Sequence, residues 1–123
     1  MSIAVVTGCA GFIASHLVDE LLKNNWIVYG IDNFHPYYSR KLKEFNLTHL
    51  KKSKNFTFIE GSILSKSDLN KIPKNIDYLF HYAAIAGVRN SILNPDEYFK
   101  INFEGTKFLL QYLQYMILLD III

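Results

Sequence analysis

Short apolar runs alternate with longer amphipathic stretches along this chain. Ile3–Val6 is an apolar run rich in β-branched residues that ends at a glycine-containing loop, which predicts a buried strand. From Phe12 to Lys23 the apolar residues recur at three- and four-residue spacing, which predicts a helix with one buried face. Further strands are predicted at Trp26–Ile31, Phe56–Glu60 and Asp77–His81.

The remaining stretches predict three more helices. Arg40–Ser53 is expected to turn Leu42, Phe45 and Leu50 inward and its lysines outward. Ser65 opens a capping box for a short helix that ends at Ile72. After a loop through Asn90, the Asn94 cap and Pro95 begin a long helix. Its inward positions are expected to be Tyr98, Ile101, Gly105, Phe108, Leu109, Tyr112 and Met116.

Strand and helix alternate throughout, which predicts the α/β class: a Rossmann-type, doubly wound parallel sheet with helices on both faces. Four strands and the following long helix fit within 123 residues, enough for one small domain. Ligands bind such sheets at the carboxyl ends of the strands, where the strand order reverses. We therefore expect the first and fourth strands to flank a crevice, with the loops after Val6, Ile31, Ile59 and Phe80 along one edge.

Composition and charge narrow the possible partners. The formal net charge is +2, too small to indicate a nucleic-acid partner, and Lys51, Lys52 and Lys54 are interpreted as a solvated helix face. The single cysteine, Cys9, is consistent with a reducing cytoplasm and is expected to pack as a small residue. No apolar run approaches the ~20 residues of a membrane span. The four histidines lack metal-ligand spacing, so no metal site is expected.

The loop after the first strand is the strongest candidate for chemistry. Gly8 permits a tight turn, Gly11 permits close approach of a pyrophosphate, and Ala14 allows the helix to pack on the strand. A pyrophosphate would sit at the helix N-terminus, where free N–H groups favour anions. The alternative is an ordinary tight strand-to-helix turn. The predicted strand before the loop, the helix after it and an acid about 20 residues on favour nucleotide binding.

That acid is Asp32, at the carboxyl end of the second strand. A carboxylate there can accept hydrogen bonds from both adenosine ribose hydroxyls and would repel a 2′-phosphate, which favours NAD over NADP. The alternative is a solvated acid in a turn.

These motifs resemble those of the extended short-chain dehydrogenase/reductases, a family of NAD-dependent nucleotide-sugar epimerases and dehydratases. The resemblance runs from about Ile3 to Leu110 and includes the spacing Gly-x-x-Gly-x-x-Ala. His81-Tyr82-Ala83-Ala84 is similar to the family's fourth-strand motif, and Asn102 matches a position that braces it. The resemblance implies NAD as cofactor, held by Gly8, Gly11, Phe12, Ile13, Asp32, Asn33, Ser62, Ile63, Tyr82, Ala83, Ala84 and Asn102.

Two loops resemble the UDP-glucuronate 4-epimerase subgroup: Asp32–Ser39 and Ala86–Ile92. Arg89 in the second loop could meet a substrate carboxylate or phosphate, although an ordinary surface arginine is the alternative. One departure is Gly61-Ser62-Ile63, where the family usually has an aspartate that accepts a hydrogen bond from adenine. Ser62 accepts without a charge, so weaker adenine binding is expected.

The family's catalytic serine or threonine and its Tyr-x-x-x-Lys pair would align beyond Ile123, so residues 1–123 are expected to form an incomplete NAD(P)-binding domain without catalytic residues. Tyr37 and Lys41 match Tyr-x-x-x-Lys formally, but they follow the second strand on the adenosine side. The apolar run Leu118–Ile123 is expected to promote aggregation.

Three functions remain open at this point. The chain could be the front part of an epimerase, which would act on a nucleotide sugar and could form a homodimer. It could also be the front part of a related dehydratase or reductase. The third possibility is a non-catalytic NAD-binding module that pairs with another chain.

Overall fold

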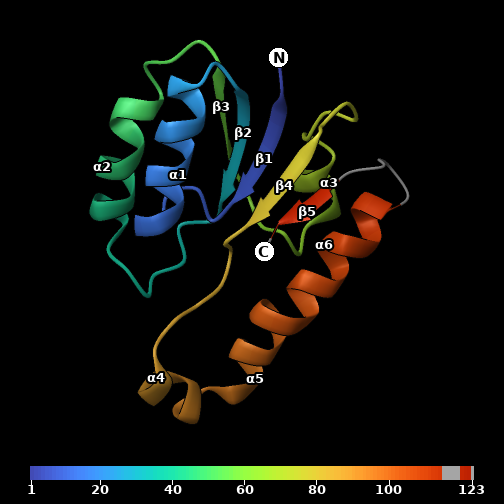
Figure 1. Ribbon diagram of the computed structural model, residues 1–123. Helices are drawn as coiled ribbons and strands as arrows, with labels where there is room; N and C mark the ends of the chain where they lie inside the picture. Colours follow the sequence, from blue (N-terminus) through green and yellow to red (C-terminus); the bar gives the residue numbers. More distant parts are fainter. Residues whose placement is uncertain (115–119, 123) are drawn as a thin grey trace.

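A computed structural model describes residues 1–114 and 120–122. Within these residues the strands form one parallel sheet in the order β3-β2-β1-β4-β5 (Figure 1). The strands are β1 (Ile3–Thr7), β2 (Ile27–Asp32), β3 (Phe56–Glu60), β4 (Tyr78–His81) and β5 (Asp120–Ile122). The predicted doubly wound α/β fold is confirmed, and β1 and β4 are neighbours, as expected for the strands flanking the crevice.

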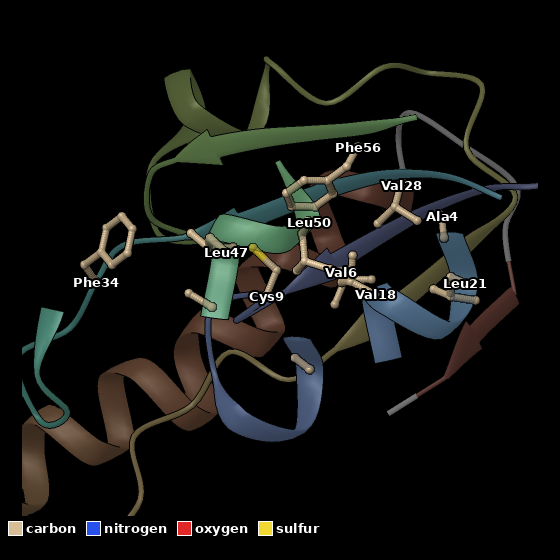
Figure 2. Close-up of a cluster of buried hydrophobic side chains, with 12 residues drawn as sticks. Ala4, Val6, Cys9, Val18, Leu21, Val28, Phe34, Leu47, Leu50 and Phe56 are labelled. Atoms are coloured by element: carbon tan, nitrogen blue, oxygen red, sulfur yellow. The ribbon is translucent and has the colours of Figure 1, made fainter. Parts of the chain in front are cut away.

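One face of the sheet is covered by α1 (Phe12–Lys23) and α2 (Arg40–Leu50). Val6 of β1 and Val18 of α1 are both fully buried in this layer. Figure 2 shows the side chains of Val6, Val18 and Leu50 gathered around Cys9. The Cys9 side chain is 0 % exposed, so the expectation of a small packed residue is confirmed.

The opposite face is covered by α3 (Lys66–Leu69) and α6 (Gly105–Gln114) (Figure 1). Side chains alternate along each parallel strand, so Val5 faces this layer while its neighbours Ala4 and Val6 face the other. Leu109 of α6 is 0 % exposed within this layer. Burial of one leucine side chain stabilises the fold by about 1.5–3 kcal/mol.

The inward face of α2 differs from the prediction. Leu42 and Phe45 are 59 % and 76 % exposed, whereas Leu50 is buried as predicted and Leu47 is also buried. Leu47 and Leu50 are three residues apart and share a face with Lys43, so this face carries fewer apolar residues than the one we predicted. The helix also ends at Leu50, before the predicted Ser53.

The segment after β4 contains a helix, α4 (Val88–Leu93), whose first residues, through Asn90, were predicted as loop. It precedes α5 (Pro95–Tyr98), a π-helical segment η1 (Phe99–Glu104) and α6. Pro95 begins α5 as predicted, but the Asn94 side chain donates to the Asn90 carbonyl and does not cap α5. Figure 1 shows α4 and α5 beyond the carboxyl ends of the strands.

Parts of the sequence predictions for the C-terminal region, at Met116, Leu118 and Ile123, lie outside the described residues. Across residues 1–114 and 120–122, no helix has the length and apolar character needed to cross a membrane.

Candidate nucleotide-binding site

A pocket with a volume of about 800 Å³ lies at the carboxyl ends of β1, β2 and β4. It is lined by all of the cofactor residues expected from the sequence except Asn102: Gly8, Gly11, Phe12, Ile13, Asp32, Asn33, Ser62, Ile63, Tyr82, Ala83 and Ala84. Residues that are far apart in sequence meet here because every β–α connection of a parallel sheet returns to the same edge.

The turn after β1 depends on glycine at position 8. Gly8 has φ +68°, and its N–H donates to the Ile31 carbonyl at 2.8 Å. A Cβ at this position would lie 2.8 Å from the carbonyl carbon of Tyr82. The Gly8 backbone therefore packs directly on the backbone that follows β4.

Gly11 has a different role, because its φ of −72° suits any residue. A Cβ here would meet only the Gly8 carbonyl oxygen, at 3.2 Å, and would otherwise stand in open space beside the pocket. Gly11 is also the N-cap of α1 and has no side chain to cap the helix, so free N–H groups of the first turn remain available to an anion. This glycine leaves room for a phosphate at the helix N-terminus.

Asp32 is almost buried, with a side chain that is 5 % exposed. Its Oδ2 accepts the Ala10 N–H at 3.1 Å, and its Oδ1 accepts the Phe34 N–H at 2.8 Å. The carboxylate therefore ties the glycine loop to the loop after β2. Each carboxylate oxygen can accept a second hydrogen bond, so capacity remains for a ligand hydroxyl.

Two polar α2 residues that line the pocket were missed by sequence reasoning. The Lys43 side chain is only 11 % exposed and its Nζ lies 3.6 Å from Asp32 Oδ1, although the α2 lysines were expected to point outward. Asn46 donates from Nδ2 to the Ala10 carbonyl at 2.9 Å. The available signal was the spacing of Lys43 four residues before Leu47, which places both on one helix face.

The loop after β3 is held by Asp68, which accepts the Ser62 N–H at 3.0 Å. This backbone hydrogen bond is the main reason that the pKa of the Asp68 carboxyl is lowered below its ordinary 3.8. The Ser62 Oγ accepts the Leu64 N–H at 3.1 Å and lines the pocket. The Asp68 amide N–H in turn donates to Ser65 Oγ, so the predicted Ser65 cap is confirmed.

The wall after β4 is fixed from two sides. Thr7 Oγ1 accepts the N–H groups of Tyr82 and Ala83 at 3.0 and 3.1 Å. Asn102 Oδ1 accepts the Ile85 N–H at 2.8 Å, while its Nδ2 donates to the Ile85 carbonyl at 2.9 Å. Asn102 does not line the pocket, so it acts on it through the backbone of this loop.

The other residues considered in the sequence, Arg89 and the formal Tyr-x-x-x-Lys match, do not line the pocket. Arg89 is exposed on α4 and does not line the pocket. Tyr37 and Lys41, the formal Tyr-x-x-x-Lys match, do not line the pocket, and the Lys41 N–H donates to Ser39 Oγ at the start of α2. The loop with Tyr37 is instead linked to α5 by His35, whose Nε2 lies 2.9 Å from Glu97 Oε1.

Residues 1–114 and 120–122 provide no structural basis for a nucleophilic thiol or for a metal site. Burial, and after it the Asp32 charge, raises the pKa of the Cys9 thiol well above its ordinary range, so Cys9 is not a nucleophile at neutral pH. No group of three or more histidine, cysteine or acidic side chains in this part of the chain is placed to hold a metal ion.

The family model named NAD dependent epimerase/dehydratase family matches residues 4–118. This chain belongs to that family. The enzymes of the family are NAD-dependent epimerases and dehydratases, so both the predicted family and its cofactor class are confirmed.

Individual relatives are consistent with the predicted subgroup. A UDP-glucuronate 4-epimerase of Thermodesulfobacterium geofontis is 41 % identical over 113 residues, which cover 90 % of this chain and 35 % of that protein. The crystal structure of UDP-glucuronic acid 4-epimerase from Bacillus cereus, in complex with UDP-glucuronic acid and NAD, has a TM-score of 0.86 and 41 % identity. The superposition covers 96 % of this chain and 38 % of that one.

A dehydratase is also similar. DesIV, a dTDP-glucose 4,6-dehydratase of Streptomyces venezuelae with NAD and TYD bound, has a TM-score of 0.79 and 29 % identity, over 89 % of this chain and 35 % of that one. The chain thus spans about a third of the length of the relatives that it matches.

Proposed function

We propose that this chain is the NAD-binding N-terminal part of a nucleotide-sugar epimerase that resembles UDP-glucuronate 4-epimerase. The observation that carries the proposal is the pocket, in which the glycine loop, Asp32 and the wall after β4 face one cavity of about 800 Å³. The matches to epimerases that bind NAD support it.

The residues of the pocket fit two parts of NAD, its pyrophosphate and its adenosine ribose. Gly11 leaves space at the N-terminus of α1 that a Cβ would enter, and this suits a pyrophosphate. Asp32, which accepts the Ala10 N–H of the same loop, can also accept from ribose hydroxyls, while its charge opposes a 2′-phosphate. Lys43, at 3.6 Å, offsets part of that charge, so the preference for NAD is expected to be moderate.

The substrate and the reaction are proposed for the intact protein. NAD, when bound, would take hydride from C4 of the sugar and return it to the opposite face. The residues described here hold and orient the cofactor, whereas the Tyr-x-x-x-Lys pair implied by the family resemblance would align beyond Ile123. We therefore expect the 123-residue chain alone to bind NAD without turning over UDP-glucuronate.

A dehydratase is the second candidate, because a dTDP-glucose 4,6-dehydratase shares the fold at 29 % identity. The front part of such an enzyme would bind the same cofactor through the same loops. Joining this chain to the C-terminal part of an epimerase or of a dehydratase, and following the sugar product by NMR, separates the two activities.

Calorimetric titration of the purified 123-residue chain with NAD and with NADP tests the binding proposal. We expect saturable binding, tighter for NAD, and loss of binding in Gly11→Ala because the added methyl group enters the phosphate position. Thermal unfolding of Gly11→Ala serves as its folding control. A folded chain that binds neither dinucleotide would refute the proposal.

The same protein preparation tests catalysis. Incubation with NAD and UDP-glucuronate, followed by NMR of the sugar, is expected to show no UDP-galacturonate. Product formed by the verified 123-residue chain would show that the residues needed for catalysis lie within it. NAD binding without turnover is expected both for the front part of an epimerase and for a non-catalytic module. If turnover is still absent after the C-terminal part of an epimerase is supplied, the non-catalytic module is favoured.

A further inference from the structure

A continuous hydrogen-bonded chain runs from β1 through β4 to α6, beneath the wall of the pocket. His81, the last residue of β4, is 8 % exposed and lies between two threonines. Its Nδ1 is 2.6 Å from Thr7 Oγ1, and its Nε2 is 2.8 Å from Thr106 Oγ1. The Thr106 hydroxyl donates to the Asn102 carbonyl at 2.8 Å.

The bonding capacity of the two hydroxyls determines where the His81 proton resides. A threonine hydroxyl has one hydrogen to donate and two lone pairs. Thr7 Oγ1 accepts from the N–H groups of Tyr82 and Ala83, so its own hydrogen must point to Nδ1. The Thr106 hydroxyl donates its hydrogen to the Asn102 carbonyl, so its oxygen must accept from His81 Nε2. Only neutral His81 with its proton on Nε2 satisfies every contact.

Resting on the proposed NAD-binding function, we propose that His81 is a positioning residue of the nucleotide pocket, which in its neutral Nε2–H form holds Thr7 in the orientation that fixes the pocket wall. Through Thr7 it orders the Tyr82–Ala83 backbone, on which Gly8 of the phosphate loop packs. Through Thr106 it is linked to Asn102, which holds Ile85.

Protonation of His81 breaks this arrangement. A second N–H, on Nδ1, would point at a Thr7 oxygen whose lone pairs are both in use, so either this contact or the hold on the wall is lost. The Gly8 turn, which is also held by its N–H bond to the Ile31 carbonyl, would then lose the part of its support that comes from the Tyr82–Ala83 backbone. NAD binding is therefore expected to weaken as His81 becomes protonated.

The surroundings of His81 favour the neutral form. Burial is the cause that lowers its pKa below the ordinary 6.5. The charged residues of η1 and α6 nearest in sequence to its partner Thr106 are Lys100, Glu104 and Lys107, and all three are exposed. The acid of α3 is Asp68, which accepts the Ser62 N–H and forms an ion pair with Lys71. In β5, Asp120 pairs in register with Tyr78, which is at the opposite end of β4 from His81. Neighbouring β1 contains no ionisable side chain.

The first test measures the NAD affinity of the 123-residue chain between about pH 5 and pH 8, where histidines titrate. We expect the affinity to fall several-fold toward pH 5, with a slope of at most about tenfold per pH unit because one proton is involved. His81→Asn keeps an acceptor for Thr7 but does not titrate in this range, so its affinity is expected to vary less than the wild type. His35 also lines the pocket and is present in both proteins, so the comparison isolates the effect of His81. An unchanged pH slope in His81→Asn would overturn the proposal.

A second test does not depend on a folded His81 variant. Long-range ¹⁵N NMR of the wild type should show an unprotonated Nδ1 and a protonated Nε2 for His81 near neutral pH, and the opposite tautomer would contradict the proposal. Thr106→Val should weaken NAD binding and Thr106→Ser should restore it, whereas equal affinities in all three proteins would count against the link. If the wild type binds no NAD at any pH, the proposed function fails, while the NMR result still decides the state of His81.

Discussion

Replacement of Gly8 by alanine should destabilise the whole fold. Gly8 has φ +68°, a region that costs an alanine about 1–2 kcal/mol. The new Cβ would also lie 2.8 Å from the carbonyl carbon of Tyr82 and 2.9 Å from the amide nitrogen of Ala83. Both are backbone atoms of the segment that follows β4, so the clash is not relieved by rotation of a side chain.

The size of the effect follows from these two contributions. Overpacking of a well-packed site costs about 1–3 kcal/mol, which gives about 2–5 kcal/mol together with the backbone strain. With a urea slope of about 2 kcal/mol per M, the unfolding midpoint should fall by about 1–2.5 M. That loss is a large part of the ~5–15 kcal/mol that stabilises a typical domain.

Equilibrium urea unfolding followed by Trp26 fluorescence and by circular dichroism measures this loss. Gly11→Ala is the matched control, because Gly11 has φ −72° and its Cβ would meet only one oxygen at 3.2 Å. It should unfold within about 1 kcal/mol of the wild type, since a helix N-cap tolerates alanine at about that cost. Equal midpoints for the two variants would refute the assignment of different roles to the two glycines.

Three further predictions concern stability. Leu109→Ala removes a side chain that is 0 % exposed and should lower the free energy of unfolding in urea by about 2–5 kcal/mol. The control Leu93→Ala, at a position that is 73 % exposed, should lower it by less than about 0.5 kcal/mol. Similar losses in the two variants would mean that α6 does not pack as described. The pKa of His81 is lowered on folding, so its contribution to the free energy of unfolding should be fully present above pH 6.5 and lost as pH falls through the pKa of the folded state. A difference in the free energy of unfolding between wild type and His81→Asn that does not change with pH would contradict this sign. Asp68→Ala removes the acceptor of the Ser62 N–H and should cost about 1 kcal/mol at neutral pH; because the pKa of Asp68 is lowered, the difference from wild type should shrink as pH falls below 3.8, and a constant difference would indicate that the charge is unimportant.

Local sequence determined the bounds of those helices and strands that have a strong apolar pattern and polar residues at their ends. The helix Phe12–Lys23 and the strand Phe56–Glu60 have the predicted bounds, because a strong apolar period or β-branched run ends at polar residues. The glycine loop and Asp32 could be placed at one edge of the sheet, since parallel connections return every such loop to that edge. Nearly all of the predicted pocket residues follow from that rule.

Tertiary packing decided what local patterns left open. Val88–Leu93 is helical although a loop was predicted through Asn90, and its exposed Ile92 and Leu93 provide no clear buried face. Lys43 lies beside Asp32 because α2 is rotated so that Leu47 packs inward, although this face carries fewer apolar residues than the one predicted to be buried.

Hydrogen-bond partners also required the structure. The sequence marked Asp32 as a ribose ligand, but its contacts with the Ala10 and Phe34 N–H groups appear only once the two loops meet. Likewise, Thr7 and His81 are separated by 74 residues, and they meet through the pairing of β1 with β4. The sequence by itself determined the fold and the edge at which a nucleotide would bind, because periodicity and turn chemistry are local; only the tertiary structure decided which polar groups satisfy one another, because those pairs depend on how strands and helices are brought together.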